Sequence, residues 1–137
     1  MINQEILYRN ATQSDVNKLS ILFKQVYIKT YGIEGVSDEF ANFIIKQFSV
    51  ERLSSLLINQ PESLFVAEYK NNLVGVVEID YDKICPSNNL CIPELNKLYI
   101  LEWFCGKGIG FQLLKMAEQM VKSKHYESIW LWVWDQN

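Results

Sequence analysis

The sequence predicts an α/β domain in which a mixed β-sheet is packed with helices on both sides. The chain has 137 residues and 49% of them are apolar, which is enough for one hydrophobic core. Apolar residues alternate in some segments and recur at helical spacing in others, in the order β–α–α–α–β–β–β–α–β. A glycine-rich turn joins the last helix to the strand before it. We therefore expect a single domain over residues 1–137.

The first half of the chain is expected to form one short strand and three helices. Residues 6–9 alternate as a strand does. Residues 12–15 then offer capping side chains before an apolar stripe at helical spacing, which should end by Gly32. A second helix is expected from Ser37 onward, and Ser49 should cap a third.

The second half is expected to form most of the sheet. Residues 63–69 and 73–81 are expected to be strands, and the connection between them is rich in Asn, which tolerates the left-handed conformation of a tight hairpin. A strand over residues 94–101 and a helix from about 108 to 124 follow a polar loop. The aromatic-rich residues 128–134 are expected to form the last strand.

Composition and charge exclude several classes of protein. The net charge of −3 gives no general attraction to nucleic acid or to an anionic membrane. The three cysteines have no CxxC spacing, so we expect no disulfide framework, no metal site and a reducing, cytoplasmic location. No apolar run approaches the ~20 residues of a membrane-spanning helix.

The glycine-rich turn is the feature with the clearest chemistry. Gly106, Gly108 and Gly110 lie two apart around Lys107, directly before a helix. The start of a helix leaves about four backbone N–H groups without partners and carries roughly half a positive charge. Glycines let this backbone approach a bulky anion, and Lys107 can add a charge. The turn therefore predicts a phosphate-binding site.

Two known glycine signatures do not fit this turn. A nucleotide P-loop requires GxxxxGK[ST], whereas Lys107 is followed by Gly108. The dinucleotide-binding fingerprint requires GxGxxG near the start of a βαβ unit, whereas the spacing here is GxGxG, late in the chain. Both interpretations fail.

The segment as a whole resembles the cofactor-binding core of the GNAT family, the acyl-CoA-dependent N-acetyltransferases. Cys105-Gly-Lys-Gly-Ile-Gly110 matches the family's phosphate loop, Gln/Arg-x-x-Gly-x-Gly/Ala, except that Cys105 stands where Gln or Arg is usual. Leu98-Tyr-Ile100 matches the strand before the loop, and Leu113-Leu114 matches the leucine pair of the helix. In weaker form the resemblance extends over residues 6–137. It implies the GNAT acyl-CoA N-acyltransferase fold.

Within that family the chain looks most similar to the PaiA-type polyamine acetyltransferases. Segments 27–31, 48–53, 94–101 and 131–137 carry this likeness. The resemblance implies a cytoplasmic enzyme that moves an acetyl group from acetyl-CoA to a primary amine of a small molecule, such as spermidine or spermine, without a metal. A protein or aminoglycoside N-acetyltransferase and a non-catalytic acyl-CoA-binding protein are the alternatives.

The resemblance also implies roles for individual residues on the cofactor side. The backbone N–H of Leu98 would face the thioester carbonyl, and the backbone of Tyr99 and Ile100 would pair with the pantetheine arm. The expected cofactor-binding residues are Leu98, Tyr99, Ile100, Gly106, Lys107, Gly108, Ile109, Gly110, Phe111 and Asn137.

Glu94 is the expected general base, because several GNAT-like enzymes carry a glutamate four residues before the position of Leu98. Strand alternation would place residues 94, 96 and 98 on one face, so that Glu94 and Leu98 serve the same cleft. A solvated position at the rim of the sheet is the alternative for Glu94, and Glu78 and Asp80 are competing acids.

Three residues are expected on the acceptor side. Tyr27 and Tyr31 fall where the first helices of GNAT-like enzymes wall the acceptor site, with core packing as the alternative for Tyr27. Glu78 is the third expected substrate-binding residue, since it can attract a cation. His125 follows the end of a helix and is expected to face water.

The resemblance makes the end of the chain unusual. Relatives continue from the last strand into a helix and two further strands, whereas this chain ends at Asn137, the first residue of that motif. We therefore expect the C-terminal helix and hairpin to be lacking, and the chain to be a fragment or to be completed by a partner. A homodimer is one such arrangement, since an exposed apolar strand promotes association.

Overall fold

The computed structural model describes residues 5–82, 93–124 and 126. Its four strands form one antiparallel sheet in chain order: β1 (Ile6–Asn10), β2 (Leu64–Tyr69), β3 (Asn72–Asp80) and β4 (Glu94–Ile100). Its α-helices are α1 (Val16–Tyr31), α2 (Asp38–Gln47), α3 (Val50–Asn59) and α4 (Ile109–Ser123). Two short 3₁₀ segments, Gln13–Asp15 and Glu102–Phe104, precede α1 and follow β4.

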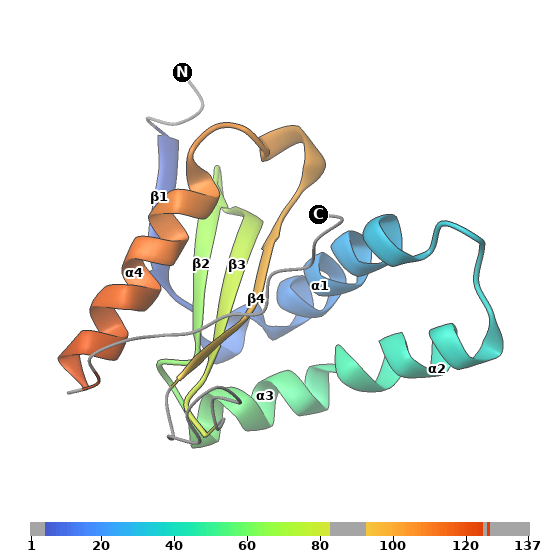
Figure 1. Cartoon of the computed structure of the whole chain (residues 1–137), viewed down its shortest axis with the longest axis horizontal. Helices are drawn as coiled ribbons and strands as arrows, with labels where there is room; N and C mark the ends of the chain where they lie inside the picture. Colours follow the sequence, from blue (N-terminus) through green and yellow to red (C-terminus); the bar gives the residue numbers. More distant parts are fainter. Residues whose placement is uncertain (1–4, 83–92, 125, 127–137) are drawn as a thin grey trace.

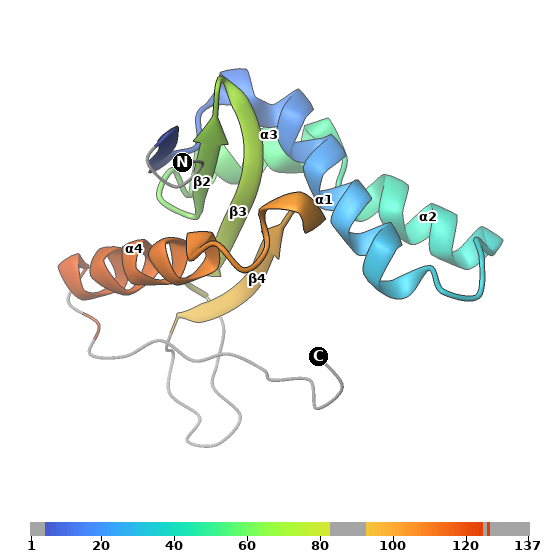
Figure 2. The same ribbon diagram turned by 90° about the horizontal axis from the view of Figure 1, so that it is seen from above.

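The helices lie on both sides of the sheet, as the sequence predicts. α4 packs on one face, over β2, β3 and β4, while α1 and α3 cover the other face (Figures 1 and 2). The second half of α1 and the whole of α2 extend sideways beyond the sheet (Figure 1). Two apolar layers result, and the segment after β4 crosses from one layer to the other.

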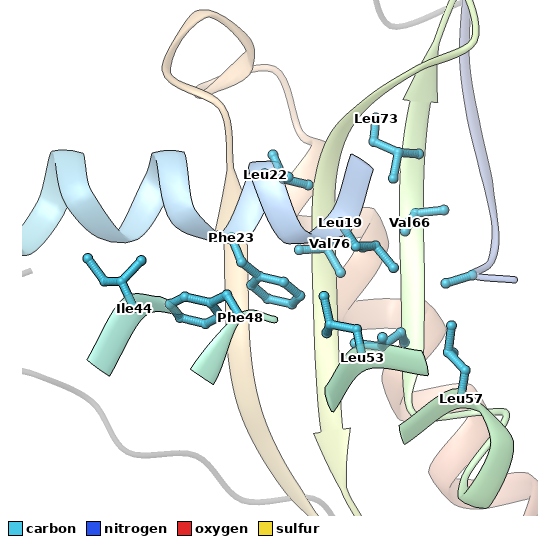
Figure 3. Close-up of a cluster of buried hydrophobic side chains, with 12 residues drawn as sticks. Leu19, Leu22, Phe23, Ile44, Phe48, Leu53, Leu57, Val66, Leu73 and Val76 are labelled. Atoms are coloured by element: carbon cyan, nitrogen blue, oxygen red, sulfur yellow. The ribbon is translucent and has the colours of Figure 1, made fainter. Parts of the chain in front are cut away.

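The layer between the sheet and α1 is built from aromatic and aliphatic side chains (Figure 3). Leu19 and Phe23 of α1 are fully buried, as is Leu53 of α3. The Phe23 ring stacks on that of Phe48, with centroids 5.3 Å apart and planes 8° from parallel. This stack joins α1 to the chain between α2 and α3, and therefore fixes how the helical layer lies on the sheet.

The layer beneath α4 follows from a strictly spaced apolar stripe. Ile109, Leu113, Ala117 and Val121 recur every four residues and are all buried against the sheet. Their spacing places them on one side of the helix, so the opposite side faces solvent. Burial of this stripe fixes the first turn of α4 against β3 and β4.

Local capping and turn chemistry agree with the sequence. The Ser37 hydroxyl accepts a hydrogen bond from the Phe40 N–H at the start of α2, and the Ser49 hydroxyl accepts one from the Arg52 N–H at the start of α3. Lys70 and Asn71 have φ values of 49° and 68°, which is the left-handed conformation expected in the β2–β3 hairpin. These predictions are confirmed to within one or two residues.

A partly buried ion pair holds the first strand. The Arg9 guanidinium donates to both carboxylate oxygens of Asp15, at 2.7 and 2.9 Å, and also to Glu68 on β2. The Asp15 side chain is 2% exposed. Hydrogen bonds from Arg9 hold the pKa of Asp15 below its usual value, against the opposing effect of burial. The cluster therefore ties β1, the start of α1 and β2 together.

The described strands are all antiparallel. The mixed character predicted for the sheet depends on the strand expected over residues 128–134, which lies outside the described residues, as do His125 and Asn137.

Candidate functional site

The glycine-rich turn connects the end of β4 to the start of α4. After Ile100 the chain makes one 3₁₀ turn, passes the exposed Cys105, and enters α4 through Gly106 and Gly108. Gly106 has φ = 76° and Gly108 has φ = 83°, both in the left-handed region that side chains disfavour. The sequence places glycine here because this turn needs that conformation twice within three residues.

The space outside the turn is open. A Cβ added to Gly106 or Gly108 would meet no atom within 4 Å, so neither glycine is needed for internal packing. Gly108 is the N-cap of α4 and has no side chain with which to cap it. The N–H groups of the first helical residues therefore point into accessible space, where an anion can bind. This cradle fits a phosphate group, and Lys107 adds a positive charge beside it.

The first residues of α4 differ in what they can offer a ligand. Ile109 is 1% exposed, so its side chain belongs to the core and its backbone N–H is what can face a ligand. Phe111 is 63% exposed and lies on the outer side of the helix. A Cβ on Gly110 would lie 3.7 Å from Leu98 Cδ2, so this glycine sits against β4. Tertiary packing thus places the turn beside the strand expected to bind the cofactor.

β4 is the last strand of the sheet over the described residues. Leu98 and Ile100 point toward α4, whereas Tyr99 points toward α1 and meets Phe23 edge-on at 5.6 Å. Burial, with smaller effects of Tyr31, Tyr27 and Glu78, raises the pKa of the Tyr99 phenol above its usual value.

The alternation of β4 breaks near its start, contrary to the sequence prediction. Glu78 of β3 pairs with Lys97, but the next residue, Ile79, pairs with Leu95, so Asn96 is an extra residue on β4. As a result, Leu95 and Leu98 both face α4 although they are three apart. The expectation that the side chains of Glu94 and Leu98 share a face is wrong, because the bulge reverses the alternation between them.

Glu94 lies on the face that Tyr99 also occupies. It pairs across the sheet with Asp80, and only 5% of it is exposed. The alternative of a solvated rim residue is therefore wrong. Its charge acts on Lys97, as does that of Glu78. The bulge thus places the expected base on the side of the sheet covered by α1.

Glu78 is also buried on this face, within a cluster of polar side chains. Its Oε2 accepts hydrogen bonds from Arg52 of α3 at 3.1 Å and from Asn96 at 3.0 Å. Its Oε1 lies 3.5 Å from the Lys97 Nζ. Burial lowers the pKa of Lys97, an effect that the Glu78 carboxylate opposes. The sequence analysis named Glu78 as a site residue but none of its partners. Lys97, a lysine inside an apolar strand, was the signal that could have indicated a buried acid beside it.

The two expected acceptor-side tyrosines are adjacent on α1 and differ in exposure. The Tyr27 and Tyr31 rings are 4.6 Å apart. Tyr27 also packs on Phe40 and Phe48, which agrees with core packing, and burial raises its pKa. Tyr31 is 47% exposed and is the one with a free surface.

Two hollows lie along α1, one beside the glycine turn and one at the connection to α2. One of about 270 Å³ lies beside the glycine turn, where Lys29 and Thr30 of α1 face Ile100, Glu102 and Cys105. Another of about 700 Å³ lies at the α1–α2 connection, between Tyr31, Val36 and Phe40. The α1 residues of the first hollow were not predicted, since only the folded chain brings them to the turn.

Comparison with known proteins agrees with this geometry. The sequence profile of the acetyltransferase (GNAT) family matches residues 23–137, which include α1 to α4 and the glycine turn. The chain belongs to the GNAT family. It is thus an acetyl-CoA-dependent N-acetyltransferase, and the fold predicted from the resemblance is confirmed.

Individual GNAT proteins resemble the chain over most of its length. An uncharacterized N-acetyltransferase of Lactobacillus delbrueckii subsp. lactis is 20% identical over 92% of this chain and 73% of its own. An uncharacterized N-acetyltransferase of Archaeoglobus fulgidus is 25% identical over 91% and 80%. The PaiA N-acetyltransferase of Thermoplasma acidophilum, crystallised with coenzyme A, superimposes with a TM-score of 0.78 and 27% identity, over 96% of this chain and 81% of that one.

Two further findings concern the described part of this GNAT protein. No cluster of three His, Cys, Asp or Glu side chains suited to a metal ion occurs among its described residues. Of the helices described, none is long and apolar enough to cross a membrane.

Proposed function

We propose that this GNAT protein transfers the acetyl group of acetyl-CoA to a primary amine of a small molecule, with a polyamine as the first candidate. The turn at Gly106 and Gly108 would hold the pyrophosphate, and the backbone of Leu98, Tyr99 and Ile100 the pantetheine arm. Glu94 would be the general base, and Tyr27 and Tyr31 would wall the acceptor site.

One observation carries the proposal. Gly106 and Gly108 are left-handed, a Cβ on either would project into open space, and that space lies at the uncapped start of α4. Two such glycines at the uncapped start of a helix let a phosphate group approach the backbone N–H groups closely. Lys107, Ile109 and Phe111 complete the proposed cofactor contacts.

The chemistry requires three things of the protein. The amine must lose a proton, its nitrogen must attack the thioester carbonyl, and the oxygen that becomes negative must be stabilised. Glu94 would take the proton, and the N–H of Leu98 would donate to the oxygen. As the C–S bond breaks, the thiolate leaves and takes up a proton, so that the products are the N-acetylated amine and coenzyme A.

The acceptor proposal is supported by the surface near Tyr31. The hollow at the α1–α2 connection is lined mainly by apolar side chains, and Glu34 is the one charged residue of its lining. An acceptor with methylene segments and a cationic amine suits such a lining. The net charge of −3 also favours a cation.

Calorimetric titration with acetyl-CoA and with desulfo-CoA tests the cofactor site. We expect a Kd in the micromolar range, equivalent to roughly −8 kcal/mol. Gly108→Ala should weaken binding at least tenfold, because its methyl group occupies the space above the turn. Gly35→Ala is the matched control, since Gly35 is also left-handed and open, with φ = 100°, but lies in the α1–α2 connection. Equal binding by both variants would exclude the turn as the phosphate site.

A panel of amines, with spermidine and spermine first, tests the acceptor and the base. Glu94→Gln should lower turnover by about 10²-fold or more at neutral pH while leaving CoA affinity intact. Asp80→Asn is the comparison, because Asp80 lies opposite Glu94 and is the competing acid. A larger loss in Asp80→Asn would transfer the role of base to that residue.

Cys105 is exposed beside the turn, at the position where the family carries Gln or Arg. If CoA binds, no amine of the panel is acetylated and Glu94→Gln changes nothing, the proposed transfer to a small amine is refuted. The single-domain organisation, the cytoplasmic location and the homodimer stay predictions.

A further inference from the structure

The Glu78 carboxylate is in polar contact with three side chains of the described structure. Arg52 approaches from α3, and Asn96 and Lys97 approach from β4, at 3.0 to 3.5 Å. Only 4% of the Glu78 side chain is exposed. Two cations already neutralise this carboxylate, Arg52 with 30% and Lys97 with 11% of its side chain exposed, so a substrate cation would have to compete with both.

The contacts with β4 fall on the bulge itself. Asn96 is the extra residue of the bulge, and Lys97 is the residue paired with Glu78 across the strands. The two side chains that hold Glu78 from this side are therefore those at which the alternation of β4 reverses. A bulge changes the relative direction of the residues before and after it, and here Glu94 and Leu98 lie two residues to either side of Asn96.

Charge balance supports a fixed arrangement. Glu78 forms ion pairs with two cations, Arg52 and Lys97, and the charge of Glu94 also acts on Lys97. In a buried site such groups are held in place, because any displacement leaves a charge without its partner. Removal of one member should therefore alter the position of the others.

We propose that Glu78 is a positioning residue, which fixes the β4 bulge through Asn96 and Lys97 and so sets the direction of the Glu94 carboxylate relative to the Leu98 N–H. This inference rests on the proposed function, since it assumes that Glu94 and Leu98 act on the same reaction. It differs from the substrate-binding role that the sequence suggests for Glu78.

Two variants test the positioning role of Glu78, each at one side of the hydrogen bond between Glu78 and Asn96. Glu78→Gln keeps the shape of the side chain but removes its charge, and Asn96→Ala removes the contact at the bulge without leaving a buried cation unpaired. We expect each to lower kcat for spermidine, or for the amine that the panel identifies, by about 10- to 100-fold. The Kd for CoA should not change, because the glycine turn is untouched.

Asp15→Asn is the matched control for loss of a buried carboxylate. Asp15 is as deeply buried as Glu78 and is likewise paired with an arginine, but it holds β1 rather than β4. This variant should lose stability and keep kcat. A comparable loss of kcat in Asp15→Asn would show that destabilisation alone explains the effect of Glu78→Gln, and would overturn the proposal.

A double-mutant cycle separates positioning from simple damage. In the Glu94→Gln background, Asn96→Ala should have little further effect on kcat, because the group that it positions is already gone. An undiminished effect would overturn the proposal. So would a Glu78→Gln variant that raises KM for the amine with kcat unchanged, since that result indicates direct binding of the substrate cation.

A spectroscopic measurement keeps the test independent of turnover. If Glu94→Gln has no effect on kcat, the assignment of Glu94 as the base fails. The bulge can still be tested through the chemical shift of the Leu98 ¹⁵N–¹H signal during titration with acetyl-CoA, and Asn96→Ala should change this shift in the bound state. An identical shift in wild type and variant would overturn the positioning role of Glu78, whatever the identity of the base.

Discussion

The Cδ1 atom of Ile100 fills the space beside Gly75, where a Cβ would lie only 2.9 Å from it. The two residues are direct partners across β3 and β4. The same Cβ would also lie 3.3 Å from Leu113 Cδ1 and 3.4 Å from Ile109 Cγ2. Gly75 therefore lets the first turn of α4 rest closely on the sheet, directly below the glycine turn.

Gly75→Ala should destabilise the protein by about 1–2 kcal/mol, because the methyl group overpacks this contact. Ile109 lies at the start of α4, so its displacement should also weaken binding of CoA. Urea denaturation and calorimetry measure the two effects. Unchanged stability would mean that Ile100 moves aside freely.

Cys105→Gln should strengthen binding of CoA. The thiol lies 3.6 Å from the Leu101 carbonyl oxygen and is exposed beside the turn. A glutamine amide at this position can donate a hydrogen bond to the phosphate of CoA that is stronger than one from a thiol. One such bond contributes about 1 kcal/mol, or roughly fivefold in Kd. Cys105→Ser is the control of similar size. Equal affinities in all three proteins would show that this position does not contact the cofactor.

Asp15→Asn should lower the free energy of unfolding by roughly 2 kcal/mol at pH 7, since the Arg9 guanidinium loses its charge-assisted bonds to Asp15 and keeps only its pair with Glu68. The pKa of Asp15 is lowered in the folded state. Its stabilising effect is therefore complete above the unfolded pKa, near 4, and is lost as the pH falls through the lower folded value. The difference between wild type and variant should shrink below about pH 4. A difference independent of pH would contradict this account.

Phe48→Ala should cost about 3–5 kcal/mol of stability, because the ring is fully buried and stacks on Phe23. Phe43→Ala is the matched control, since this neighbouring phenylalanine is 45% exposed and should cost much less. Both are measured by urea denaturation. Similar losses would place the helical core elsewhere than around Phe48.

Most of the described fold could be predicted from local patterns. The stripe in α1, the serine caps of α2 and α3, and the Asn-rich hairpin each depend on residues within a few positions of one another. Such elements can be predicted because the residues that cause them lie in the same segment as the element itself. The glycine turn could be predicted for the same reason.

The part of the site that was missed depends on contacts between distant segments. Asn96, the extra residue of the bulge, donates a hydrogen bond to Glu78, 18 residues earlier, and Glu78 accepts another from Arg52, a further 26 residues back. Strand periodicity assumes uninterrupted alternation, so it placed Glu94 on the face of Leu98. One extra residue was enough to reverse that assignment.

The extension of α1 and α2 beyond the sheet has a consequence for engineering. The connection between these helices carries Ile33 and Val36, which are 86% and 67% exposed, and it lies apart from the strand and turn proposed to bind the donor. Exposed positions such as these can therefore be exchanged without disturbing either apolar layer, whereas Gly32, where a Cβ would lie 2.7 Å from the Ile28 carbonyl oxygen, must be kept. A library of grafted α1–α2 connections would vary the choice of amine while the acetyl-CoA machinery stays constant.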